Sequence, residues 1–347
     1  MLKDVDCAGV VIGRFQGFTS AHLELFKAAA TENDRVIVLV GSANRRKSIK
    51  NPWSAEERID AIKFCMDGMD LLEKITFVPI NDYPEMYDWV ENVYTTIHDK
   101  LDDDIITLYG CDKDESSFYL KHFPGWELKL IDQIAGFDAT EVRRAWFEGK
   151  QTLHYLRENT VMNPKLGMWL FAQQYNANLQ EEWNFYQNEA DRFSKYPFPE
   201  TLTFCCADAV LIHDGHVLMI QRGAAPGKGC WALPGGFKNR DETFLQAAMR
   251  ELREETKIDL TDNQLEETIR HYKMFDDPSR SLGIPRISGA YLFDVSSNRG
   301  LYKERPSVAA GDDACNVRWT PLEGIENLND IYDDHQLIIN DLIKFKD

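Results

Sequence analysis

The first 150 residues alternate short apolar runs with stretches of helical character, and this alternation restricts the fold more than any other feature. The stretch 54–67 opens with Ser54-x-x-Glu57, a capping-box pattern that favours a helix start. Strands alternating with helices predict βαβ units, and therefore an α/β domain with a mostly parallel sheet covered by helices on both faces. The predicted strands lie at residues 8–12, 36–40, 75–80, 105–109 and 128–131.

The second half has a different pattern. "TFCCADAVLIHDGHVLMIQR" contains two strand-like runs joined by Asp214-Gly215, which indicates a tight hairpin. A helix is expected over 241–256, a strand in "RISGAYLFDV", and a closing helix after Asp334. These elements predict a second domain with a mixed sheet.

The boundary between the domains is expected after a long polar helix over 163–193, where "KYPFPETL" interrupts the pattern with two prolines. We therefore divide the chain into residues 1–183, a linker over 184–200, and residues 201–347.

Composition narrows the class of protein. Among 347 residues, 44% are hydrophobic and 28% charged, as in globular proteins, and no run approaches the length of a membrane span. A net charge of −18 argues against nucleic-acid binding. Seven scattered cysteines without a C-x-x-C pair, and an acidic N-terminus, predict a cytoplasmic protein with reduced thiols and no membrane contact. Whether the chain forms a homo-oligomer is left open.

The segment "RELREE" concentrates negative charge on one predicted helix. Glu251, Glu254 and Glu255 stand at i, i+3 and i+4, where like charges repel by about 0.2–0.5 kcal/mol per pair. Carboxylate oxygens gathered in this way suit a hard cation such as Mg²⁺ or Mn²⁺. Arg250, four residues before Glu254, is expected to orient that side chain, and Arg253 to face solvent.

The surrounding segment "WALPGGFKNRDETFLQAAMRELREET" resembles the Nudix box. The resemblance implies a Nudix hydrolase domain of α/β/α form, with Glu251, Glu254 and Glu255 as metal ligands beside Gly235 and Gly236. Lys257 stands where the family has its late glycine. Because that glycine normally ends the helix in a left-handed conformation, Lys257 implies mild strain or a different helix exit.

Two further segments, "DDPSRSLGIPRISGAYLF" and "AAGDDACNVRW", are similar to parts of ADP-ribose pyrophosphatases. The resemblance implies ADP-ribose as the substrate, split into AMP and ribose 5-phosphate. Arg222, Arg280 and Arg286 are candidates for contacts with its phosphates. Asp312 or Asp313 is a candidate for a further metal ligand or a base.

In the first domain, polar segments follow the ends of the predicted strands, where open α/β sheets bind ligands. "AGVVIGRFQGFTSAH" runs from a buried strand through Gly13 into a helix that carries His22 in its first turn, an arrangement that suits an anion. The segments that follow the other strands are "NPWSAEER", "YGCDKDESSFYL" and "DATEVR".

Together these segments resemble the nucleotidylyltransferases, and most closely the archaeal-type nicotinamide mononucleotide (NMN) adenylyltransferases, with a Rossmann-like fold. The resemblance implies that ATP and NMN are converted to NAD and pyrophosphate, with His22 and Arg143 acting on the phosphates. The residues that it places at the nucleotides are Gly13, Arg14, Phe15, Thr19, His22, Asp112, Thr140 and Arg143.

Some positions depart from the family pattern. The usual proline is Gly17, expected to loosen the turn; the first histidine is Thr19, which keeps a hydroxyl; and the glycine is Ala21. Trp89, with Trp53 as the alternative, is the candidate for stacking on nicotinamide. The basic cluster of residues 45–47 either closes over phosphates or is an exposed patch.

The sequence thus predicts a bifunctional enzyme of NAD metabolism that uses Mg²⁺ or Mn²⁺. Three alternatives stay open. The first domain could transfer a nucleotidyl group to another phosphate acceptor. The Nudix domain could act on another nucleoside diphosphate derivative, or serve as a ligand sensor without hydrolysis.

Overall fold

The computed structural model divides into two compact units, residues 1–179 and 180–347. It describes residues 7–83, 85–101, 105–111, 115–132, 139–149, 164–173, 176–198, 201–278, 280–296, 304–311 and 313–345. No helix in these ranges is both long enough and apolar enough to cross a membrane. Asp112 and Asp312 fall outside them, so the predictions for these two residues stay untested. The predicted linker over 184–200 also stays a prediction, although its first half is helical here.

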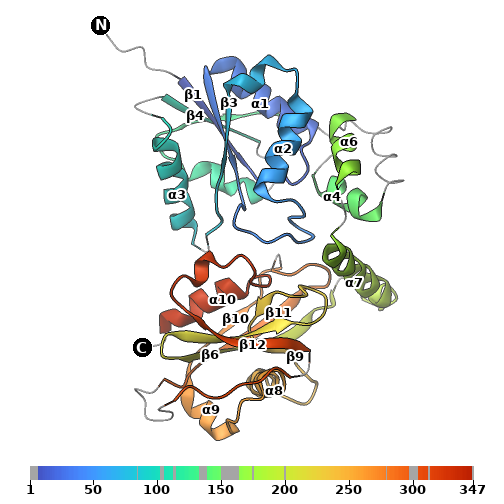
Figure 1. Ribbon diagram of the computed structural model, residues 1–347, viewed down its shortest axis with the longest axis vertical. Coiled ribbons are helices and arrows are strands. Elements are labelled where there is room, and N and C mark those ends of the chain that lie inside the picture. Colours follow the sequence, from blue (N-terminus) through green and yellow to red (C-terminus); the bar gives the residue numbers. More distant parts are fainter. Residues whose placement is uncertain are drawn as a thin grey trace. The chain divides into compact units, whose positions relative to one another are not determined.

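The first unit contains a five-stranded parallel sheet in the order β3-β2-β1-β4-β5 (Figure 1). All five strands were predicted from the apolar runs. The order reverses beside β1, and ligands of doubly wound sheets bind at the carboxyl ends of strands at such a reversal. The strands are β1 (Cys7–Gly13), β2 (Arg35–Val40), β3 (Ile75–Pro79), β4 (Ile105–Gly110) and β5 (Glu127–Leu130).

Helices connect these strands and cover the sheet. Ser54 caps α2 in the predicted capping box, since its side chain accepts from the Glu57 N–H at 3.3 Å and Glu57 accepts from the Ser54 N–H at 2.8 Å. The helices are α1 (Ser20–Glu32), α2 (Ala55–Met66), α3 (Met86–His98), α4 (Ala139–Glu148) and α6 (Pro164–Ala172), with 3₁₀ turns at Asp70–Lys74 and Glu115–Lys121.

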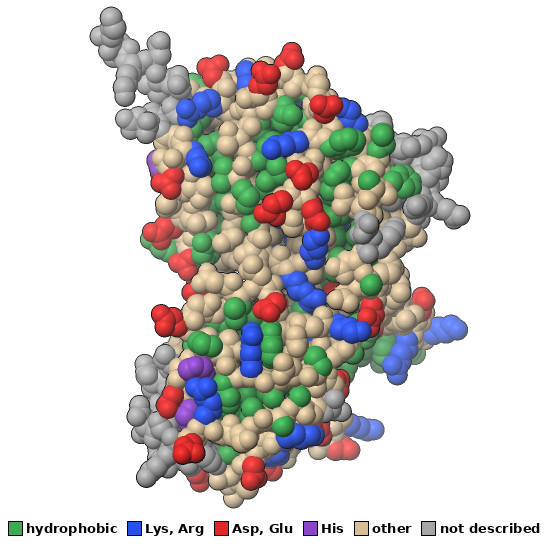
Figure 2. Space-filling view, in the orientation of Figure 1, with side chains coloured by type: hydrophobic (Ala, Val, Ile, Leu, Met, Phe, Trp, Pro, Cys, Tyr) green, Lys and Arg blue, Asp and Glu red, His purple; other side chains and the backbone are tan. Residues whose placement is uncertain are grey.

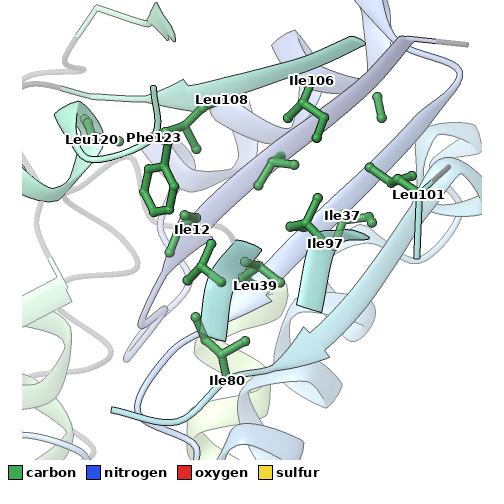
Figure 3. Close-up of a cluster of buried hydrophobic side chains, with 13 residues drawn as sticks. Ile12, Ile37, Leu39, Ile80, Ile97, Leu101, Ile106, Leu108, Leu120 and Phe123 are labelled. Carbon is green, nitrogen blue, oxygen red and sulfur yellow. The ribbon is translucent and has the colours of Figure 1, made fainter. Parts of the chain in front are cut away.

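One core lies between the sheet and α3. Figure 3 shows Ile12, Leu39 and Leu108 from neighbouring strands pointing to the same side of the sheet as Ile97 of α3. Leu120 and Phe123 from the segment after β4 complete the cluster. Because adjacent strands are in parallel register, their alternate apolar residues form one continuous face.

The second unit contains a mixed sheet in the order β10-β11-β6-β7-β12, as predicted. Only the β11–β6 pair of this order is parallel. Asp214 and Gly215, with φ of 41° and 71°, make the tight turn between β6 and β7. The strands are β6 (Phe204–His213), β7 (His216–Arg222), β8 (Trp231–Ala232), β9 (Gly235–Phe237), β10 (Ile269–Phe275), β11 (Arg286–Asp294) and β12 (Ala314–Pro321).

Two helices cover the two faces of this sheet. α8 (Phe244–Thr256) buries Ala248, Met249 and Leu252 in one apolar cluster, and α10 (His335–Leu342) buries Ile338 and Ile339 in another. α8 begins three residues later than the predicted start because Thr243 caps it, accepting from the Gln246 N–H. A shorter helix, α9 (Asp262–Thr268), precedes β10, and 3₁₀ turns lie at Ile325–Asn327 and Ile343–Phe345.

The prediction of a single polar helix over 163–193 is wrong. The chain forms α6 and then α7 (Ala177–Phe193), and the side chain of Asn176 accepts from the Asn178 N–H at 2.9 Å. This contact is typical of a residue that starts a helix, which explains the separate second segment.

Figure 2 shows how charged side chains are distributed on one face of the molecule. On the visible face, Asp and Glu side chains lie among Lys and Arg side chains instead of gathering in one patch (Figure 2). All seven cysteines are described, and all are free thiols.

Candidate active sites

The loop after β1 fixes the orientation of His22. Thr19 caps α1, and its backbone N–H donates to Nδ1 of His22 at 3.0 Å, with the Thr19 Oγ1 also 3.0 Å from that nitrogen. Because a backbone N–H can only donate, Nδ1 acts as an acceptor, and the proton of the neutral ring is on Nε2. His22 therefore presents a donor nitrogen in the first turn of α1, where the helix dipole favours an anion.

Phe15 and two glycines shape this loop. The Phe15 side chain is buried, 5.2 Å from the ring of His22 in an edge-on contact, so any contact of Phe15 with a nucleotide would come from its backbone. A Cβ at Gly13 would lie 2.8 Å from Cζ of Phe15, so the missing side chain of Gly13 makes room for that ring. Gly17 has a φ of +97°, which proline cannot adopt, and packs against Val142 instead of loosening the turn.

Arg143 joins α4 to the same loop, as the predicted site requires. Its Nη1 donates to the carbonyl of Gln16 at 3.0 Å, and its Nη2 donates to Oγ1 of Thr140 at 3.0 Å. The buried Gln16 side chain in turn donates to the carbonyl of Trp53 at 2.9 Å. The structure thus gathers His22, Thr140 and Arg143 around the β1–α1 loop, with Arg14 exposed at its start.

Arg58 was not identified from the sequence, although it ends the quoted "NPWSAEER" segment. Its buried guanidinium donates to the carbonyls of Arg14 and Gly41, the second at 2.7 Å, and its Nε donates to the carbonyl of Ser54 at 3.0 Å. Desolvation lowers the pKa of Arg58 to about 10, so it stays cationic at neutral pH. Nothing in the residue pattern distinguishes this buried arginine from an exposed helical one.

The candidates for nicotinamide stacking both belong to aromatic clusters. Trp89 is half-buried between Tyr119 and Phe123, with ring centroids at 5.8 and 5.9 Å. Trp53 is 3% exposed and packs against Trp146, and its indole Nε1 has no hydrogen-bond partner among the described residues. Both stay predictions.

The basic cluster of residues 45–47 is held against acids. Arg45 pairs with Asp82 at 3.0 Å, and Lys47 pairs with Glu57 at 2.5 Å. Asp82 also accepts from the hydroxyl of Ser42 at 3.1 Å. Two of the three basic residues in the loop after β2 thus pair with acids, and closure of the cluster over phosphates stays a prediction.

In the second unit, one arginine partly balances the acidic helix. Arg250 contacts Glu242, Glu251 and Glu254, each at 2.8 Å, and also donates to the carbonyl of Phe237 at 3.0 Å. Hydrogen bonds to these carboxylates raise the pKa of Arg250, the one to Glu242 most strongly. The expected orienting contact with Glu254 is confirmed. Arg253, which was expected to face solvent, has a side chain 33% exposed; its Nε donates to the carbonyl of Leu260 at 2.9 Å and its guanidinium pairs with Asp262.

Glu255 turns away from solvent toward β9. Its buried carboxylate accepts from the Gly235 N–H at 2.9 Å, and desolvation raises its pKa to about 8, with Glu251 and Asp313 adding to the rise. A Cβ at Gly235 would lie 2.3 Å from Oδ1 of the buried Asp208, and a Cβ at Gly236 would lie 2.5 Å from Oε1 of Glu251. Both glycines therefore allow carboxylates to approach the backbone, although they lie in a short strand instead of the predicted turn.

These acids fit a divalent ion chemically. The donor set consists of oxygen atoms, and the buried Glu255 carboxylate lies in the field of Glu251 and Asp313 without a neutralising ion pair among its described contacts. In the present side-chain arrangement, no three acidic, imidazole or thiol groups of the described residues are placed to hold a metal ion together. Glu251 and Glu254 each contact Arg250 through one carboxylate oxygen, so an ion at all three glutamates would share these two carboxylates with Arg250.

Lys257 ends α8 in the left-handed conformation, as its position in the box implied. Its φ and ψ are 51° and 26°. The loop that follows residue 308 completes the helix end, because the amides of Ala309 and Gly311 donate to the carbonyls of Thr256 and Glu255. The left-handed end of the helix is therefore kept with a lysine in place of the glycine. Lys257 carries the backbone strain expected of a residue with a side chain in this conformation.

The three predicted phosphate-binding arginines have partners within the protein. Arg222 donates to the carbonyl of Pro226 and lies over the ring of Tyr332, with its guanidinium carbon 4.5 Å from the ring centroid. Arg280 makes a bidentate pair with Asp334 at 2.8 and 3.0 Å. Arg286 pairs with Glu189 at 2.5 Å. Their contact with ADP-ribose stays a prediction, and a ligand would have to share them with these partners.

Comparison with known proteins separates the same two regions. Residues 10–122 match the Cytidylyltransferase-like family, and residues 205–342 match the NUDIX domain. The chain is 37% identical over 154 residues to the nicotinamide/nicotinic acid mononucleotide adenylyltransferase of Acinetobacter baylyi, which is 44% of this chain and 81% of that protein. It is 31% identical over 139 residues to the ADP-ribose pyrophosphatase of Methanocaldococcus jannaschii, which is 40% of this chain and 72% of that protein.

A third similarity spans both units. The crystal structure of a bifunctional NMN adenylyltransferase/ADP ribose pyrophosphatase from Francisella tularensis matches with a TM-score of 0.84 and 33% identity, over 99% of this chain and 100% of that chain. A second structure of it, complexed with AMP and Mn ion, matches with a TM-score of 0.82 and 32% identity, over 98% of this chain and 99% of that chain.

Fold and site together define a nucleotidyltransferase-type domain followed by a Nudix domain, a class whose hydrolases require a divalent metal ion. The parallel sheet with its histidine-bearing β1–α1 loop supports the first half of this assignment, and the glycine-flanked acidic helix supports the second. The chain belongs to the family of bifunctional NMN adenylyltransferase/ADP-ribose pyrophosphatases, enzymes of NAD metabolism.

Proposed function

We propose that the first unit transfers AMP from ATP to NMN, forming NAD and pyrophosphate. The NMN phosphate attacks the α-phosphorus of ATP, so the protein supplies position and charge and no nucleophile. His22, held by Thr19 with its proton on Nε2, would donate to a phosphate oxygen. Arg143, held by Thr140 and Gln16, would neutralise charge on the departing pyrophosphate. The observation that carries this proposal is the joining of His22 and Arg143 through one loop.

We propose that the second unit hydrolyses ADP-ribose to AMP and ribose 5-phosphate. Glu251, Glu254 and Glu255, beside Gly235 and Gly236, would hold Mg²⁺ or Mn²⁺. The bound ion would supply positive charge at the pyrophosphate and promote attack by water. Arg250 orients Glu251 and Glu254, and Gly235 holds the Glu255 carboxylate through its N–H. The supporting observation is the buried carboxylate of Glu255 beside a second acid and two glycines.

Product analysis tests both proposals in one preparation. The full chain is incubated with ATP plus NMN, and separately with ADP-ribose, each with Mg²⁺ or Mn²⁺. We expect NAD and pyrophosphate in the first reaction, and AMP and ribose 5-phosphate in the second. Formation of another dinucleotide would support a different phosphate acceptor for the first unit. No cleavage of ADP-ribose would support another substrate for the second unit, or a ligand sensor without hydrolysis.

Two substitutions assign the activities to their units. Glu254→Gln should abolish ADP-ribose cleavage and leave NAD synthesis unchanged, while His22→Ala should do the reverse. Glu266→Gln, an exposed acid on α9, is the matched control and should affect neither activity. Loss of both activities in Glu254→Gln, in a protein that is still folded, would contradict separate sites.

A further inference from the structure

The buried face of α7 carries acids where a packed helix normally carries apolar residues. Glu182, Tyr186, Glu189 and Phe193 follow one another at intervals of four, three and four residues, which is the spacing of one helix face. Glu182 and Glu189 are only 8% and 9% exposed. Acids at such positions require partners, because an unpaired buried carboxylate is strongly unfavourable.

Glu189 holds the loop that leads into β11. It pairs with Arg286, and its Oε2 accepts from the N–H of Ile284 at 3.3 Å. Arg286 also donates to the carbonyls of Leu282 and Ile284 at 3.0 and 2.9 Å, so one ion pair fixes several backbone groups of the loop. At Gly283, whose φ is +71°, a Cβ would lie 2.8 Å from Oε2 of Glu189, which shows how closely the loop approaches α7.

This loop carries Arg280, which balances a buried acid beside the glutamates. Arg280 donates to the carbonyl of Arg286 at 3.4 Å and pairs with Asp334. Its charge also acts on Asp208, whose carboxylate reaches the backbone at Gly235, the residue that binds Glu255. Contacts therefore connect Glu189 to Arg286 and Arg286 to Arg280, and the charge of Arg280 acts on Asp208 beside Gly235.

A second route starts at Tyr186. Its hydroxyl is hydrogen-bonded to that of the buried Tyr332, whose ring lies under the guanidinium of Arg222. Arg222 in turn acts electrostatically on Glu255 and Asp208. Glu189 and Tyr186, about one turn apart on α7, thus lead to Arg280 and Arg222, whose charges both act on the buried Asp208.

We propose that α7, which precedes the residues matched by the NUDIX family, supports substrate binding at the pyrophosphatase site. Glu189 and Tyr186 are positioning residues that set Arg280, Arg286 and Arg222 for the phosphates of ADP-ribose. This inference rests on the proposed hydrolysis of ADP-ribose. It adds that the functional unit of the hydrolase begins at α7 and not at β6, and that its substrate affinity depends on a helix outside the Nudix box.

Steady-state kinetics of the full chain test this role. In Glu189→Ala and in Tyr186→Phe, KM for ADP-ribose should rise about tenfold while kcat changes by less than about threefold, because the arginines are displaced and the catalytic glutamates are not. Glu189→Gln keeps an acceptor for Arg286 and for the Ile284 N–H, so its KM should lie between those of Glu189→Ala and the wild type. NAD synthesis by each variant and its thermal unfolding report whether the chain is folded.

Glu181→Ala is the matched control, because Glu181 is an exposed acid on the same helix that pairs with Lys228 at 3.2 Å. Wild-type kinetics in this control and a raised KM in the two test variants support the proposal. An unchanged KM in both test variants overturns it, as does a loss of activity that only follows the loss of folded protein. If the wild-type chain leaves ADP-ribose intact, the proposed function and this inference both fail. If the wild type cleaves ADP-ribose and both test variants keep its KM, only this inference fails.

Discussion

Some single residues of this protein are constrained by close approach to backbone atoms. Gly311 illustrates this, because a Cβ there would lie 2.5 Å from the carbonyl oxygen of Glu254 and 2.2 Å from Cε of Lys257. The lysine side chain could move away, but the helix carbonyl could not. A side chain at this position would therefore disturb the end of α8, the helix that carries the proposed metal-binding glutamates.

Gly311→Ala should therefore destabilise the second unit by about 1–3 kcal/mol, as overpacking does, and should lower ADP-ribose cleavage. Thermal unfolding and the cleavage rate measure the two effects. Gly229→Ala provides the comparison, since Gly229 has a φ of +80° but its Cβ would meet no atom within 4 Å, whereas Gly311 is not in the left-handed region and its Cβ would meet atoms of Glu254 and Lys257. Wild-type stability in Gly311→Ala would contradict the importance of the close approach.

A pH dependence follows from His335. Burial lowers the pKa of His335 to about 4, below its ordinary 6.5, and the ring accepts from the Leu233 N–H at 2.9 Å. The unfolded chain thus binds a proton that the folded chain excludes. The contribution of His335 to stability is complete above pH 6.5 and is lost as the pH falls toward 4, by at most about 3 kcal/mol.

Urea unfolding from pH 7.5 to 4.5 measures this effect. Relative to the wild type, His335→Gln should be less stable at pH 7.5, and the difference should shrink as the pH falls, because glutamine does not titrate. Comparing the two proteins removes the contribution of the other titrating groups. Parallel stability curves would show that His335 is not the group responsible.

At the scale of elements, the carboxyl ends of β1 and β2 and the start of α2 are joined by one side chain. Arg58 of α2 binds the carbonyls of Arg14 and Gly41, which follow β1 and β2 respectively. Such junctions give the polar loops at the end of a parallel sheet a fixed shape. The shape of the β1–α1 loop, the proposed ATP-binding loop, is therefore expected to depend on Arg58, which binds backbone carbonyls.

Arg58→Met should leave these carbonyls buried without donors and destabilise the first unit by about 3 kcal/mol or more, since each unpaired group costs about 1–3 kcal/mol. NAD synthesis should fall further than the loss of folded protein explains, because the loop around His22 loses its anchor. Lys63→Met, a change to a less buried cation of the same helix, provides the comparison. Similar losses in both variants would exclude a specific role for Arg58.

At the scale of the whole molecule, the two compact units should respond separately to their ligands. A ligand that binds the folded state at 100 times its Kd stabilises it by about 2.7 kcal/mol. ATP should therefore raise the unfolding temperature of one transition, and AMP with Mn²⁺ that of another. Scanning calorimetry of the full chain measures both. A single transition that moves with either ligand would show that the units unfold as one.

The strands of the first unit, and the hairpin and β11 of the second, could be predicted from local sequence. Apolar runs fix a strand because alternate residues must be buried, and the Ser54–Glu57 pair fixes a helix start through contacts within four residues. The acidic helix was equally local, since Glu251, Glu254 and Glu255 lie within one turn and a half of each other. The single long helix over 163–193 failed because composition alone does not show where a new cap begins.

The sequence by itself determined the strands of the parallel sheet and the grouping of acids on α8, because those properties depend on neighbours along the chain. Only the tertiary structure decided how the charges are shared. In the folded chain, the buried Glu255 carboxylate accepts from the Gly235 N–H, and Glu251 and Glu254 pair with Arg250. Arg58 and Glu189 are buried beside partners that are distant in sequence. The reason is physical: burial and the distance between charges set these energies, and both arise only when separate elements pack together.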